Sequence, residues 1–130
     1  MAAAGYIAIA PDLLSERGKD SQTYTDKEAA TKAVSALPAA QILADLDAAA
    51  DYALKLPSGN GAIAVTGFCW GGGQSFTYAN HNPKLKAAFV FYGVGPDSPA
   101  AAEKFPARST VFTARRMPGS VRRFRKRAKS

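Results

Sequence analysis

The chain has 130 residues, of which 47% are hydrophobic and 21% charged, a composition that suits one hydrophobic core and argues against disorder. A single cysteine excludes a disulfide scaffold, and the apolar stretch near the start, residues 1–11, is too short to span a membrane. The net charge of +7 is uneven: residues 1–106 hold eight Lys/Arg and ten Asp/Glu (−2), whereas residues 107–130 hold nine Lys/Arg and no acid. The basic character therefore belongs to the terminal segment alone.

The first half of the chain predicts one strand and two helices. The apolar run of residues 5–10, closed by Pro11 and Asp12, predicts a buried strand that ends in a turn. Thr25 and Glu28 have the spacing of a capping box, which predicts that a helix starts there. After an interruption at Pro38, a second helix is expected to run to about residue 56. Its apolar side chains recur at helical spacing: Ile42, Leu46, Ala49 and Ala53.

The second half continues the alternation of strands and helices. Residues 62–66 predict another buried strand, a glycine-rich turn follows, and a helix is expected from there to about residue 80. Residues 86–92 predict a third strand. Strands alternating with helices indicate an α/β fold with a parallel sheet. Three strands are few for such a sheet, so the pattern predicts the central part of a larger fold.

Candidate chemistry lies in the turn at residues 67–71, which has the pattern Gly-x-nucleophile-x-Gly between a predicted strand and a predicted helix. An abrupt strand-to-helix turn requires flanking residues without bulk, as Gly67 and Gly71 are, and it presents Cys69 at the carboxyl end of the sheet. The helix start stabilises negative charge there, and the N–H of Trp70 is placed to donate to an oxyanion.

Two other interpretations of this turn are open. Cys69 could be an ordinary buried cysteine, although the pattern and its context favour a nucleophile. The glycines of residues 71–73 could cradle a phosphate, but they lack the Lys-Ser/Thr of a P-loop and the Gly-x-Gly-x-x-Gly of a dinucleotide site.

At these residues the chain resembles the dienelactone hydrolase family, in residues 5–13, 67–72 and 88–93. The resemblance implies a three-layer α/β-hydrolase sheet, of which this chain holds the central strands, and hydrolysis of a small-molecule ester or lactone without metal or organic cofactor. It places the nucleophile at Cys69, an oxyanion donor at the Trp70 N–H, and a substrate-binding arginine near Arg17, although Glu16 could occupy that position. The elbow glycines would be Gly67, Gly71 and Gly72.

The catalytic base of such a site is missing from the sequence. The one histidine, His81, follows Cys69 by 12 residues at the far end of the predicted helix, about 15 Å from the sulfur. The family's histidine and aspartate come after later strands, and Asp97 arrives too early for that role. The resemblance therefore implies a piece cut at both ends and with little activity of its own. The absence of a leader favours the cytoplasm, and the oligomeric state is left open.

The basic segment, residues 107–130, departs from the family pattern that covers residues 1–106. With permitted codons, reading two bases further on gives a peptide containing Gly-Glu-Glu-Asp-Ala-Arg-Val, which resembles the family's aspartate loop. We therefore expect a frameshift near the codons for residues 104–107 and a non-native or disordered tail. For this segment the alternative is a nucleic-acid-binding tail, with Phe112 and Phe124 among the cations. For the chain as a whole the alternative to a hydrolase is a non-catalytic binding module.

Overall fold

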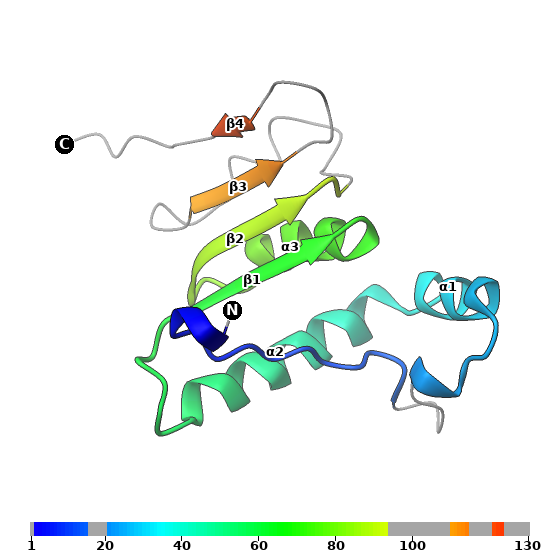
Figure 1. Cartoon of the computed structure of the whole chain (residues 1–130), viewed down its shortest axis with the longest axis horizontal. Helices are drawn as coiled ribbons and strands as arrows, with labels where there is room; N and C mark the ends of the chain where they lie inside the picture. Colours follow the sequence, from blue (N-terminus) through cyan, green and yellow to red (C-terminus); the bar gives the residue numbers. More distant parts are fainter. Residues whose placement is uncertain (1, 16–20, 94–109, 115–120, 124–130) are drawn as a thin grey trace. The chain divides into compact units, whose positions relative to one another are not determined.

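The computed structural model of the chain describes residues 2–15, 21–93, 110–114 and 121–123 (Figure 1). The chain divides into two units, residues 1–59 and residues 60–130. The described part of the first unit contains helices and a non-helical segment at residues 6–12, and the second unit holds the sheet. Among the described residues no single helix is long and apolar enough to cross a membrane. The two helices of the first unit pass that test only when joined, and they are bent by 94° at their junction.

The predicted strand at residues 5–10 is absent. Residues 6–10 form neither helix nor strand, and their side chains are exposed, with Tyr6 68% and Ile7 51% accessible. A strand exists only where a neighbour accepts and donates its backbone hydrogen bonds. An apolar run therefore shows that a segment suits a buried strand, but it does not supply the partner.

Helix α1 spans Lys27–Ser35, and Asp26 caps its start. The Asp26 carboxylate accepts hydrogen bonds from the N–H groups of Glu28, at 3.0 Å, and Ala29, at 3.2 Å. The predicted capping box placed this role on Thr25, one residue too early. Asp26 takes the role because its two carboxylate oxygens satisfy two of the first free N–H groups at once.

Helix α2 spans Ala39–Lys55 and begins directly after Pro38. The predicted apolar face is confirmed: Ile42 is buried, and three further members are partly buried, namely Leu46, Ala49 and Ala53.

The second unit is an α/β structure whose sheet has the order β1-β2-β3-β4 (Figure 1). Strands β1 (Ile63–Phe68), β2 (Leu85–Phe91) and β3 (Thr110–Ala114) run parallel, and β4 (Val121–Arg123) is antiparallel to β3. Helix α3 (Trp70–His81) connects β1 to β2. The α/β class and the two central strands are thus confirmed, and β3 lies in the segment expected to be a tail.

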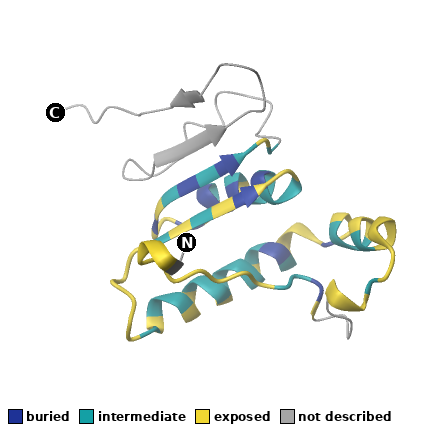
Figure 2. Ribbon diagram, in the orientation of Figure 1, coloured by how far each residue is buried: buried dark blue, intermediate teal, exposed yellow. Residues whose placement is uncertain are grey.

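Burial alternates along β1 and β2, as expected for a sheet covered on one face by a helix (Figure 2). In β1, Gly67 is buried whereas its neighbours Thr66 and Phe68 are exposed; in β2, Ala88 and Val90 are buried, at 0% and 1% accessibility. Helix α3 packs against both strands. The turn between β1 and α3 therefore stands at the carboxyl end of two paired parallel strands.

Candidate active site at the β1–α3 turn

Cys69 is the single residue between the end of β1 and the start of α3, and its side chain is exposed. Its backbone has φ 51° and ψ −120°, a conformation that costs a non-glycine residue on the order of 1–3 kcal/mol. A sharp turn of this kind lifts the central side chain out of the sheet, as in the nucleophile elbow of α/β hydrolases. The strain is at the residue that the sequence pattern singled out.

Backbone hydrogen bonds hold Cys69 in this conformation. Its N–H donates to the carbonyl of Phe91 at the end of β2, at 3.0 Å, and its own carbonyl accepts from the N–H groups of Gly72 and Gly73, at 3.0 and 3.2 Å. Both backbone polar groups of the strained residue are therefore paired. The bonds on its carbonyl side belong to the helix, and the bond on its N–H side belongs to the neighbouring strand.

Position 67 has room only for glycine. A Cβ built on it would overlap the carbonyl of Gly71 and would lie 2.5 Å from Ser75 Oγ. Ser75 is buried, and its hydroxyl donates to the Gly71 carbonyl at 2.9 Å. The end of β1 and the first turn of α3 therefore touch through backbone atoms, as a tight strand-to-helix turn demands.

The expectation that Gly71 must also lack bulk is wrong. A Cβ on Gly71 would meet no atom within 4 Å beyond its chain neighbours and its own helix backbone. The crowded position is Gly72, where a Cβ would lie 2.9 Å from the Phe91 carbonyl oxygen and 3.0 Å from Gly93 Cα. The reason is that a Cβ on Gly71 would point where no described residue lies within 4 Å, whereas Gly72 faces the end of β2.

Trp70 is the first residue of α3, and its side chain is partly buried. The N–H groups of a helix's first turn have no acceptor within the helix, and together they carry the positive end of the helix dipole. The Trp70 N–H therefore belongs to a set of donors suited to a nearby anion.

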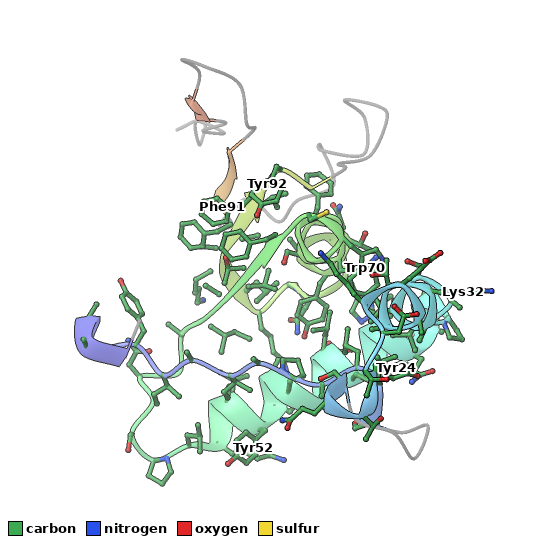
Figure 3. All side chains as sticks on the ribbon, turned by 45° about the vertical axis from the view of Figure 1, so that its right-hand side comes forward. Tyr24, Lys32, Tyr52, Trp70, Phe91 and Tyr92 are labelled. Atoms are coloured by element: carbon green, nitrogen blue, oxygen red, sulfur yellow. The ribbon has the colours of Figure 1, made fainter. Side chains whose placement is uncertain are left out.

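Three aromatic rings lie together at the carboxyl ends of β1 and β2. The rings of Phe68 and Phe91 stack with centroids 4.8 Å apart and planes inclined by 17°, and the Tyr92 ring lies 6.0 Å from that of Phe68. Phe68 and Tyr92 are exposed, at 55% and 52%. In Figure 3, Phe91 and Tyr92 lie on one side of α3 and Trp70 on the other. Tyr92 also has a positive φ, of 41°, so left-handed backbone occurs at the ends of both strands.

His81 is far from this turn, as predicted. It is the last residue of the 12-residue helix α3, and it is exposed. The rise of an α-helix places it about 16 Å along the axis from Trp70, well beyond the roughly 3 Å at which a base could take a proton from Cys69. Its ring lies 6.0 Å from that of Tyr78 in the same helix.

Arg17 and its neighbour Glu16 lie outside the described residues, as does Asp97. The residues that flank the Arg17 segment are described, and Asp12 ties them together. Its carboxylate accepts from the N–H of Ser21, at 2.7 Å, and from that of Leu14, at 3.0 Å. These two bonds, that of Ser21 foremost, lower the pKa of Asp12 from its ordinary value.

Sequence reasoning singled out Cys69, Trp70, Gly67 and Gly72, and it took Asp12 as a turn signal. It did not single out Phe91 or Gly93. Nothing in the sequence shows that the Phe91 carbonyl reaches Cys69, because backbone atoms carry no sequence signal. Among the described residues, no three His, Cys, Asp or Glu side chains group as metal ligands.

Comparison with protein families matches residues 1–114 to the model of the dienelactone hydrolase family. The chain belongs to this family. Its fold is therefore of the α/β-hydrolase type. The match includes residues 107–114, which the sequence pattern had placed outside the family segment.

Individual relatives agree with the family assignment. A protein of Yersinia pestis assigned as a carboxymethylenebutenolidase is 43% identical over 94 residues, covering 72% of this chain and 35% of that protein. The carboxymethylenebutenolidase of Pseudomonas putida is 34% identical over 95 residues, covering 70% and 40% respectively. A solved structure from Klebsiella pneumoniae, assigned as a dienelactone hydrolase, is 38% identical with a TM-score of 0.57, covering 77% of this chain and 45% of that one. This member of the dienelactone hydrolase family thus spans less than half the length of these relatives.

Proposed function

We propose that this chain carries the nucleophile of a hydrolase acting on small-molecule carboxylic esters or lactones, with Cys69 as the nucleophile. The observation that supports the proposal most strongly is the strained, exposed Cys69 at the junction of β1 and α3. Strain of 1–3 kcal/mol persists where the surrounding structure enforces it, and such residues cluster at active sites. Membership of a family whose relatives are named for hydrolysis agrees with this role.

The proposed chemistry is acyl transfer through a thioester. The Cys69 thiolate gives an electron pair to the carbonyl carbon, and the carbonyl π electrons move onto oxygen. The Trp70 N–H donates to that oxyanion, at the positive end of α3. When the intermediate collapses, the C–O bond to the alcohol breaks and the alkoxide takes a proton. Water then attacks the thioester, which releases the acid and returns the thiolate.

The second half of this cycle needs a base, and the chain's one histidine, His81, lies at the opposite end of α3 from Cys69. Loss of triad members lowers turnover by several orders of magnitude. We therefore propose that the chain by itself accepts an acyl group on Cys69 and releases it slowly. Arg17, in the segment that Asp12 closes, remains part of the proposal as a substrate-binding residue.

The experiment is the release of p-nitrophenol from p-nitrophenyl acetate by the 130-residue chain and by the Cys69→Ala variant. The proposal predicts a fast release approaching one equivalent, followed by slow turnover, with the fast phase lost in Cys69→Ala. His81→Ala serves as the matched control and keeps the fast phase. A fast phase that survives in Cys69→Ala would contradict the assignment.

A further inference from the structure

We propose that Gly93 is a positioning residue for Cys69: its close contact with Gly72 sets how near the start of α3 stands to the end of β2. The inference rests on the proposed function of Cys69 and adds to it a residue outside the nucleophile turn. The family pattern in the turn itself covers residues 67–72, whereas Gly93 follows the next strand.

The contact between the two glycines is tight from both sides. A Cβ on Gly93 would overlap the backbone of Gly72 and Gly73, coming within 2.7 Å of Gly72 Cα. A Cβ on Gly72 would lie 3.0 Å from Gly93 Cα and 3.1 Å from Gly93 N. Neither glycine has a φ in the left-handed region. Space alone, and not backbone conformation, therefore demands glycine at both positions.

The segment of residues 91–93 contacts the nucleophile turn at two points. At its first residue, the Phe91 carbonyl accepts the 3.0 Å hydrogen bond from the Cys69 N–H. At its last residue, Gly93 packs on Gly72, whose N–H in turn donates to the Cys69 carbonyl at 3.0 Å. The left-handed Tyr92 between them bends the chain so that both contacts form. The segment thus supports Cys69 through both of its backbone polar groups.

A side chain at residue 93 must move the start of α3 away from β2, because the atoms it would strike are backbone atoms that cannot rotate aside. The Trp70 N–H and Cys69 lie in that first turn and would move with it. Displacement of about 1 Å in a reacting group can lower a rate by up to about a hundredfold. Gly93→Ala should therefore slow acylation of Cys69 more than its effect on folding explains.

The test compares three variants of the 130-residue chain: Gly93→Ala, the milder Gly72→Ala, and Val90→Ala as a control. Val90 is a buried residue of the same strand, 1% accessible, and its truncation leaves a cavity without adding atoms near Cys69. Two quantities are measured under native conditions: the rate of Cys69 acylation by p-nitrophenyl acetate, and the hydrogen exchange rate of the Cys69 amide. The urea midpoint of each variant measures its stability, so that changes in acylation and exchange can be compared between variants that are destabilised to the same extent.

We expect Gly93→Ala to slow acylation about tenfold or more and to accelerate exchange of the Cys69 amide. Gly72→Ala should do both to a smaller extent, and Val90→Ala should do neither beyond what its urea midpoint predicts. If Gly93→Ala changes both quantities no more than Val90→Ala does at equal stability, the positioning role is refuted. If the unmodified chain is not acylated at Cys69, the proposed function fails, while the exchange measurement still decides whether Gly93 holds the turn.

Discussion

The N–H of Cys69 and the carbonyl of Phe91 are joined by a 3.0 Å hydrogen bond across the carboxyl ends of β1 and β2. The bond links Cys69, one of the two non-glycine residues with positive φ in the described chain, to the last residue of the neighbouring parallel strand. The same carbonyl oxygen limits the space at Gly72. The β1–α3 turn is therefore supported by β2 as well as by the strand and helix that it connects.

The two glycines that flank Cys69 in the sequence pattern should respond to alanine with opposite signs. Gly67→Ala places a Cβ against the Gly71 carbonyl, and overpacking of this kind costs about 1–3 kcal/mol. Gly71→Ala meets open space and gains about 0.5–1 kcal/mol of helix propensity. Urea unfolding measures both. Equal destabilisation by the two variants would contradict the packing described for this turn.

The start of α1 gives a second test, between two adjacent residues. Asp26→Ala removes the carboxylate that accepts from Glu28 and Ala29, so it should lower the free energy of unfolding by about 1 kcal/mol. Thr25→Ala should change it by less than about 0.5 kcal/mol. The measurement is urea unfolding followed by far-ultraviolet circular dichroism. A larger loss in Thr25→Ala would restore the capping box predicted from sequence.

Asp12 should make the loop of residues 12–21 sensitive to acid. Its pKa is lowered by the N–H groups of Ser21 and Leu14, so ionisation favours the folded loop. This stabilisation is fully present above the ordinary carboxyl value near 3.8 and is lost as the pH falls through the lowered pKa.

The amide proton shifts of Ser21 and Leu14 report this transition by NMR. They should titrate together with a midpoint below 3.8. In Asp12→Asn the common titration should vanish. A midpoint at or above 3.8, or an unchanged titration in Asp12→Asn, would contradict this role of Asp12.

The central part of the fold was predictable because its signals are local. Apolar runs at residues 62–66 and 86–92, separated by a glycine-rich turn and a helical stretch, correspond to β1, α3 and β2. The position of Cys69 followed from the Gly-x-Cys-x-Gly pattern, although only Gly67 of the two flanking glycines meets a steric demand of the backbone. His81 was correctly excluded by helix geometry alone.

What the sequence missed depends on contacts between distant segments. The run at residues 5–10 has the composition of a buried strand, yet pairing decides whether it becomes one, and these residues form no strand. Gly72 rather than Gly71 is crowded because β2 ends against one side of α3. Position 93 carries no motif that ties it to residue 72, 21 positions earlier. Such contacts become visible only in three dimensions.

The coding DNA offers a test that is independent of the structure. We propose a frameshift near the codons for residues 104–107, because the net charge changes there from −2 to +9 and an alternative frame can encode a family-like peptide. The family match extends to residue 114, inside β3. Sequencing should show Gly-x-x-Asp-Ala-Arg-Val or a close variant two bases further on. An intact alternative frame without such a peptide would remove this interpretation.

The most direct test of the account is to locate the acyl group itself. The chain is mixed with p-nitrophenyl acetate at limiting concentration, quenched in acid, digested with pepsin and mapped by mass spectrometry, with denatured chain as the reference. We predict that the acetyl group lies on Cys69 in the folded chain and spreads over lysines and the cysteine after denaturation. Acetylation that reaches the same residues in the same proportions in both samples would show that the fold does nothing to activate this thiol.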